Sequence, residues 1–153
     1  MALIVLDASV VIAHLDARDA LHTQATEYLD SHAGDDFRLP ASAYAEVLVE
    51  PARTGRSADL TEAVAKAGFR IEPITAQIAE RAASLRAGRR PIRLPDALIV
   101  ATGEVLDADA VVTADRRWRR FQRAHVISSA LPSNRAANPH PASPQSAQPN
   151  MRL

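Results

Sequence analysis

The chain has 153 residues, of which 47% are hydrophobic, and this length favours one globular domain over two. Formal charges balance at zero, so any attraction to nucleic acid or membrane must come from local patches. The absence of cysteine excludes disulfides, thiol nucleophiles and thiolate metal sites, which leaves oxygen or imidazole ligands for any metal.

The first half of the chain alternates short apolar runs with helical patterns. ALIVL at 2–6 predicts a buried strand, and helical spacing follows at 8–17. An amphipathic helix is predicted at 21–34, closed by Gly34, and a strand at 37–40. The next segment, 41–55, predicts a helix that Pro51 ends or kinks, followed by a helix at 57–68 with Ser57 as its N-cap.

The second half continues the alternation. A strand is predicted at 69–73, a helix at 75–88 with Gly88 as its C-cap, and a mostly apolar, buried helix at 95–108. Strands at 110–113 and 125–128 complete the pattern. Strands that alternate with helices indicate an α/β domain around a parallel sheet of five short strands.

The two ends of the sequence differ from each other. MALIVLDAS has no basic region and its apolar run soon meets an acid, so we expect a core strand and no signal peptide. No run reaches the roughly 18 apolar residues that span a bilayer, so we expect a soluble, cytoplasmic protein that does not bind membranes. Residues 132–153 are rich in Pro, Ser and Asn, which predicts a folded domain at 1–131 and a disordered tail at 132–153.

Four acids lie where strands end or helices begin. Taken singly, Asp7, Asp96 and Asp115 are typical helix N-caps, and Glu46 is typical of a solvated helix face. Taken together they are more informative, because parallel strands end at one shared edge and ligands bind there. Four carboxylates at that edge would repel one another unless a divalent cation compensated their charge. Oxygen ligands without cysteine suit Mg²⁺ or Mn²⁺ better than Zn²⁺.

Four stretches of the sequence carry a family resemblance. IVLDASVVIAHLD, AYAEVLVEP, LPDALIVATGEVL and VVTADRRWRRF, in this order, resemble the acidic motifs of PIN-domain nucleases, most closely those of VapC-type toxins of type II toxin–antitoxin pairs. The resemblance runs from residue 2 to about residue 128 and implies a PIN-like three-layer fold. It implies Mg²⁺- or Mn²⁺-dependent endonucleolytic cleavage of RNA, restrained by a cognate antitoxin. By position, its metal-binding acids fall on Asp7, Glu46, Asp96 and Asp115.

The resemblance also suggests separate roles within the site. Phosphodiester hydrolysis there would use metal-activated water. Asp7 and Asp115 are the expected direct ligands because strand ends fix them, and Asp96 would complete the shell directly or through water. Glu46 would bind a second ion or orient the water, and the sequence leaves both open. The hydroxyls that match the family pattern, and that are expected to support the ligands, belong to Ser9 and Thr113.

Basic residues follow the last acid. Trp118 among them either stacks on a base or, with Phe121, anchors a short helix to the core. A second basic cluster precedes Asp96 and either lines the same groove or is solvated; it comprises Arg86, Arg89, Arg90 and Arg93. The arginines after the last acid are expected to bind the RNA backbone, with a merely solvated face as the alternative: Arg116, Arg117, Arg119, Arg120 and Arg123.

Other functions fit less well. A phosphatase with a D-x-D loop needs an acid where Ser9 stands, and a phosphoacceptor receiver domain needs a late lysine, whereas Lys66 is the only lysine. The remaining alternative is a non-catalytic PIN-fold module that binds RNA or protein and uses the acids as caps. Apolar-rich helices at 21–33 and 41–50 offer surface for partners, so we expect a homodimer and a tight complex with a small antitoxin.

Overall fold

The structure is a computed structural model that describes residues 1–88 and 92–128. Arg89 and Arg90 of the second basic cluster, and the whole predicted tail at 132–153, lie outside the described residues. The elements follow one another as β1 (Leu3–Leu6), α1 (Ala8–Leu15), α2 (His22–Ser31), β2 (Asp36–Pro40), α3 (Ala41–Arg53), α4 (Ser57–Lys66), β3 (Arg70–Glu72), α5 (Ala76–Ala87), α6 (Leu94–Val105), β4 (Ala110–Thr113), the 3₁₀ helix η1 (Arg116–Arg120) and β5 (Ala124–Val126).

The five strands form one parallel sheet in the order β3-β2-β1-β4-β5. The central strand β1 places Val5 opposite Arg38 of β2 on one side and Val111 of β4 on the other. Val5 and Leu6 are fully buried, as a strand covered on both faces requires. The predicted α/β fold with a five-strand parallel sheet is therefore confirmed.

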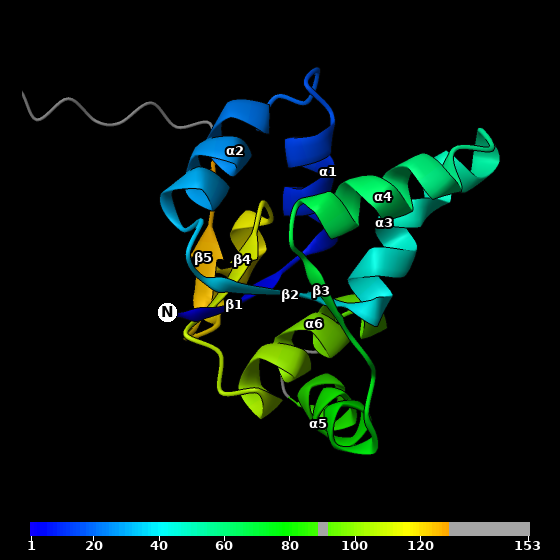
Figure 1. Cartoon of the computed structure of the whole chain (residues 1–153). Helices are drawn as coiled ribbons and strands as arrows, with labels where there is room; N and C mark the ends of the chain where they lie inside the picture. The colour runs from blue at the N-terminus through cyan, green and yellow to red at the C-terminus, as the bar shows by residue number, and fades with distance from the viewer. Residues whose placement is uncertain (89–91, 129–153) are drawn as a thin grey trace, which may run out of the picture.

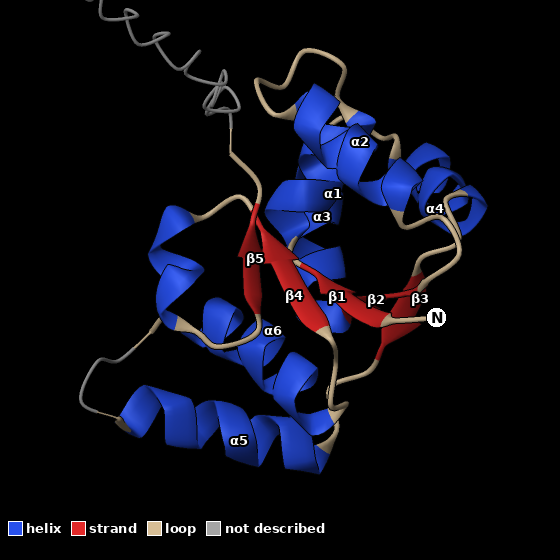
Figure 2. Ribbon diagram, turned by 90° about the vertical axis from the view of Figure 1, so that its left-hand side faces the viewer, coloured by secondary structure: helices blue, strands red, loops and turns tan. Residues whose placement is uncertain are grey.

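Helices cover both faces of this sheet and make three layers. The helices α1 to α4 lie on one face, and α5 and α6 pack together on the other, as Figures 1 and 2 show. This follows from the strand order, because the chain moves from β1 out to β3 and then crosses back beneath the sheet to β4. No helix in residues 1–88 or 92–128 combines the length and apolar character needed to cross a bilayer.

Helix α6 packs unusually close to β4. A Cβ added at Gly103 would overlap the side chain of Val111, so only glycine lets the helix backbone approach the strand at this point. The helix is apolar on the side that faces the sheet, with Ile99 and Val100 buried there. This close approach fixes α6, and with it the start of the helix that carries Asp96.

Two predicted helix ends differ from the structure, whereas Gly88 is confirmed as the C-cap of α5. Arg56, not Ser57, occupies the N-cap position of α4, because α3 runs on past Pro51 and the chain turns at Gly55 with φ of 70°. Helix α2 ends at Ser31 and not near Gly34. The His32 ring lies 2.8 Å from the carbonyl of Tyr28, and this contact satisfies a carbonyl of the last turn.

The order in which the chain adds strands reverses between β1 and β4, because β2 and β3 lie on one side of β1 whereas β4 and β5 lie on the other. Strands β1 and β4 are neighbours although most of the domain separates them in sequence, and in sheets of this kind ligands bind beside the carboxyl ends of such a pair. Helices α3 and α6, from opposite faces, contact each other at this edge. Residues that follow β1 and β4 therefore meet residues of α3 and α6.

Candidate active site

Asp7 lies at the carboxyl end of the central strand, with only 8% of its surface exposed. It occupies the N-cap position of α1, yet its carboxylate makes no capping bond to that helix. Its Oδ2 atom instead accepts hydrogen bonds from Ser9 Oγ at 2.5 Å and Thr113 Oγ1 at 2.7 Å. The interpretation of Asp7 as a simple helix N-cap is therefore wrong, because two hydroxyls hold its carboxylate at the sheet edge.

The two hydroxyls also connect Asp7 to the chain beyond β4. Ser9 Oγ accepts a hydrogen bond from the backbone N–H of Ala114 at 3.0 Å. Thr113 Oγ1 accepts one from the backbone N–H of Asp115, also at 3.0 Å. The structure thereby brings Ser9 and Thr113 to Asp7, and it fixes the backbone that carries Asp115 relative to the central strand.

Asp115 forms the N-cap of η1. Its Oδ1 accepts a hydrogen bond from the backbone N–H of Arg117 at 2.9 Å, as the capping interpretation predicts. The side chain of Arg117 also donates from Nε to Oδ1 at 3.0 Å and to Oδ2 at 2.9 Å, and from Nη2 to Oδ2. These side-chain bonds from Arg117 are the main reason why the pKa of Asp115 lies below its usual value.

Asp96 and Glu46 approach Asp7 from the two helices that meet at this edge. Asp96 lies in the first turn of α6, whose N-cap is Arg93, so Asp96 is not a cap. Burial raises the pKa of Asp96, the charge of Asp7 raises it further, and Arg117 opposes the change. The pKa of Glu46 on α3 is also raised, first by partial desolvation of its carboxylate and then by the charges of Asp7 and Asp96. The residue as a whole is exposed.

The four carboxylates form an acidic cluster, but they do not point to one common position where a metal ion could bind several of them. Within the described part of the chain, no three Asp, Glu or His side chains stand close enough together to hold one metal ion. The side chain of Asp115 is turned onto Arg117, which accounts for part of this spread. Asp7 keeps Oδ1 free of hydrogen bonds within that same part of the chain. Donors that are all carboxylate oxygens, with mutual repulsion to relieve, fit Mg²⁺ or Mn²⁺.

The structure places the predicted RNA-binding arginines in two different positions. Helix η1 exposes Arg116, Arg117, Arg119 and Arg120. Arg123 lies instead at the start of β5, where its guanidinium donates to the carbonyl of Ala108 and, at 2.6 Å, to Asp107. Those partners precede β4, so Arg123 is at the end of the sheet opposite the acids.

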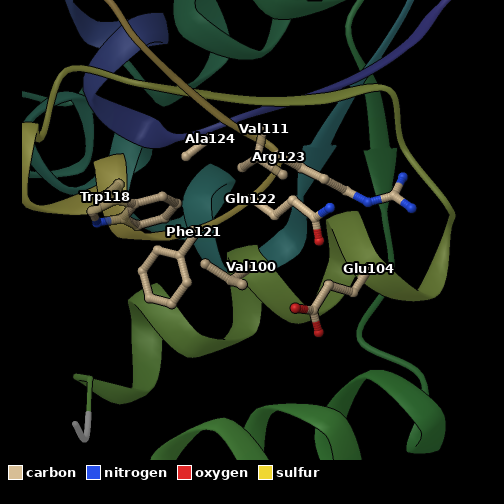
Figure 3. Close-up of a pocket in the computed structure, with 8 residues that line it drawn as sticks. All are labelled: Val100, Glu104, Val111, Trp118, Phe121, Gln122, Arg123 and Ala124. Carbon is tan, nitrogen blue, oxygen red and sulfur yellow. The ribbon is translucent and has the colours of Figure 1, made fainter.

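Trp118 does not offer a stacking face. Only 3% of it is exposed, and its ring meets Phe121 edge-on with 6.1 Å between ring centroids. Both rings line a cavity of about 50 Å³ beside Val100, and Figure 3 shows them against α6. The stacking interpretation is therefore wrong, and the anchoring interpretation is confirmed: the indole fixes η1 on α6 and so holds its arginines beside the acids.

Arg93 is a neighbour of the site that the sequence left undecided. It is exposed at the N-cap of α6, and its charge lowers the pKa of both Asp96 and Glu46. The sequence did contain a signal for this position: Arg93 precedes Asp96 by three residues, and that spacing brings side chains together on a helix. Arg86 of the same basic cluster lies in the last turn of α5.

A groove of about 800 Å³ runs between α1, α3 and α4, and Glu46 lies on its rim. Its lining mixes apolar and charged side chains. The exposed fractions of Ile12 and Val49 are 40% and 48%, so apolar surface faces solvent here. The groove has the size and the apolar content of a site for a peptide segment.

The PIN domain family profile matches residues 4–124. A toxin–antitoxin complex from Klebsiella pneumoniae is similar in structure, with TM-score 0.68 and 21% identity over 84% of this chain and 98% of the other. VapC20 of Mycobacterium tuberculosis, a sarcin–ricin loop cleaving toxin, gives TM-score 0.59 and 20% identity over 71% and 86%. FitAcB of Neisseria gonorrhoeae gives 0.60 and 25% over 73% and 87%. Comparison with curated sequences gives no significant match.

Proposed function

The chain belongs to the PIN domain family, and from this premise we propose that it is a divalent-metal-dependent endoribonuclease that acts as the toxin of a toxin–antitoxin pair. The observation that carries the proposal is the placement of Asp7. Its carboxylate is buried at the end of β1, where the strand order reverses, is held by two hydroxyls, and lies close enough to Glu46 and Asp96 to raise the pKa of both. A capping acid would not need this support, whereas a metal ligand with a fixed position would.

The chemistry assigned to this cluster is hydrolysis of an RNA phosphodiester. A divalent ion bound by the acids would activate the attacking water and neutralise charge on the phosphoryl group. Asp7 and Asp115 are the proposed direct ligands, and Asp96 completes the set from α6. Ser9 and Thr113 keep the Asp7 carboxylate in one orientation.

Glu46 has a different role in this proposal. It stands on a helix at the solvent side of the cluster, and burial together with the charges of Asp7 and Asp96 raises its pKa in the metal-free protein. We therefore propose that Glu46 orients the attacking water or binds a second ion. The exposed arginines of η1 would hold the RNA backbone beside it, since arginine binds phosphate oxygens through two parallel hydrogen bonds.

The proposed partner is a small cognate antitoxin, and the chain is proposed to work in the cytoplasm as a homodimer. Similar structures include toxin–antitoxin complexes, and this supports an antitoxin for the present chain. Glu46 lines the groove between α1, α3 and α4, so a segment lying in it would contact this acid of the cluster. Co-expression with the product of the adjacent gene, followed by size-exclusion chromatography with light scattering, tests both partners. A monomer that elutes alone would contradict them.

Cleavage of a cellular RNA pool tests the activity. Purified, antitoxin-free protein is incubated with Mg²⁺ or Mn²⁺, with EDTA, and as the Asp7→Asn and Asp115→Asn variants. Metal-dependent fragments that disappear in both variants support the nuclease. Asp30→Asn, an exposed acid near the end of α2 and close to the start of β2, is the matched control and should cut normally.

The rival function is a binding module of the same fold. Intact RNA under every condition, with folded protein that still binds RNA in EDTA, would favour it. Two observations are on its side: the capping geometry of Asp115 and, among the described residues, the lack of three acids close enough together to hold one metal ion. Metal-dependent cleavage would exclude it.

A further inference from the structure

We propose that Arg117 is a built-in cation that competes with the divalent metal for Asp115, so that metal binding requires the guanidinium to leave the carboxylate. This inference rests on the proposed metal-dependent function. It assigns to Arg117 a role in the metal-free protein that differs from RNA binding.

The geometry of the pair leaves little of Asp115 for a metal. Nε of Arg117 lies 3.0 Å from Oδ1 and 2.9 Å from Oδ2, and Nη2 also donates to Oδ2. The backbone N–H of the same residue caps Oδ1 at 2.9 Å. Both carboxylate oxygens are thus engaged by one neighbour. The positive charge of the guanidinium would also repel a divalent ion at either oxygen.

Arg117 acts on more than one acid of the cluster. Its charge also lowers the pKa of Asp96, so the guanidinium lies within electrostatic reach of a second proposed ligand. In the metal-free protein it thereby supplies part of the positive charge that four neighbouring carboxylates require. The same position is unfavourable for the arginine once a metal is present.

The contact is exposed enough to be reversible. The side chain of Arg117 is 75% exposed and that of Asp115 is 26% exposed, so water surrounds much of the ion pair. Exposed ion pairs are weak, because solvent screens them and two side chains lose conformational freedom. A set of carboxylates that binds a divalent ion together can displace such a partner. The backbone cap from Arg117 does not use the guanidinium, so η1 keeps its N-cap when the side chain moves away.

Mn²⁺ affinity tests the competition without any assay of activity. Titration calorimetry on purified, antitoxin-free protein compares the wild type with Arg117→Gln. Removing the competitor should tighten Mn²⁺ binding about two- to five-fold, the range that a weak exposed ion pair allows. Arg117→Lys keeps the charge but loses the planar fork, so it should fall between the two.

The charge change needs its own control. Arg119→Gln removes one positive charge from the same helix without touching Asp115 and should leave the affinity close to the wild-type value. Arg120→Gln reports the effect of charge alone at closer range, since Arg120 influences Asp115 through space. If Arg117→Gln binds Mn²⁺ no more tightly than these two variants, the competition is wrong. Thermal melting confirms that each exposed substitution leaves the protein folded.

A spectroscopic readout follows the side chain itself. The Nε–H signal of Arg117, identified in ¹H–¹⁵N spectra by its loss in Arg117→Gln, should shift as Mg²⁺ is added. An unchanged signal while Mg²⁺ binds would overturn the inference. If the proposed metal-dependent function is itself wrong, the titrations give a different result. Wild type and Arg117→Gln would then both bind no Mn²⁺, and Asp7→Asn would give the same titration as the wild type.

Discussion

The hydroxyl of Thr113 donates a hydrogen bond to Oδ2 of Asp7 across 2.7 Å and joins the ends of two strands that are 106 residues apart. Both residues are buried. The bond therefore contributes to the fold and also fixes the orientation of the carboxylate at the centre of the site.

Replacing Thr113 with valine tests this bond. Valine keeps the shape but removes the donor to Asp7 and the acceptor for the backbone N–H of Asp115, so the buried carboxylate of Asp7 keeps one hydroxyl in place of two. We expect the free energy of unfolding to fall by about 1–3 kcal/mol, measured by urea denaturation in EDTA. Thr113→Ser keeps the hydroxyl and should lose less. Equal stability of Thr113→Val and wild type would show that the bond is dispensable.

Gly103→Ala tests the close packing of α6 on β4. The added methyl would overlap Cγ2 of Val111, whose side chain is buried in the core, so the helix or the valine would have to shift. We expect a loss of about 1–3 kcal/mol in the free energy of unfolding. In a Val111→Ala background the overlap disappears, so the same change should cost much less. Two equal costs would mean that the residues do not interact.

The elements of this fold were predictable because each carries a strong local signal. The apolar runs and the helical spacing fixed the type of every element, and the parallel arrangement followed from their alternation. The same logic was enough to bring Asp7 and Asp115 to one edge. Helix ends such as that near Gly34 were less predictable, because they depend on side-chain contacts such as those of Ser31 and His32 with the carbonyl of Tyr28.

Side-chain partners could not be predicted in the same way. The sequence groups Arg117 and Arg123 in one basic cluster, yet η1 carries the chain from the carboxyl end of β4 to the start of β5. Arg123 is therefore at the far end of the sheet, while Arg117 folds back onto the acid two residues before it. Trp118 is buried for a related reason, since a helix this short needs an anchor.

Asp96→Asn should stabilise the metal-free protein at neutral pH. The folded pKa of Asp96 is raised above the ordinary value of 3.8, so the fold favours the protonated carboxyl. The favourable contribution is present below the unfolded pKa and is lost as pH rises through the folded pKa. At pH 7 the ionised group therefore opposes folding, and asparagine removes that charge at nearly the same shape.

Thermal melting in EDTA measures this effect. The melting temperature of Asp96→Asn should exceed that of the wild type by a few degrees at pH 7. The difference should vanish below the unfolded pKa, where the wild-type carboxyl is protonated in both states. Mg²⁺ should raise the melting temperature of the wild type more than that of the variant. A variant less stable than wild type at pH 7 would contradict the repulsion argument.

The separation of the arginines predicts different salt dependences of RNA binding. Each phosphate contact of a single strand adds about 0.7 to the slope of log K against log salt concentration. Arg119→Gln should reduce the slope by about one such contact, because Arg119 is exposed on η1, the short helix that begins after Asp115. Arg123→Gln should leave the slope unchanged and lower stability, because it loses its bonds to Ala108 and Asp107.

Fluorescence anisotropy with a labelled RNA measures both slopes, in an Asp7→Asn background that prevents cleavage. The two arginine variants have the same net charge, so a difference between them reports position and not total charge. If Arg123→Gln reduced the slope as much as Arg119→Gln, the RNA would also contact the start of β5. The bound strand would then extend over η1 to the amino end of the sheet, well beyond the acidic cluster.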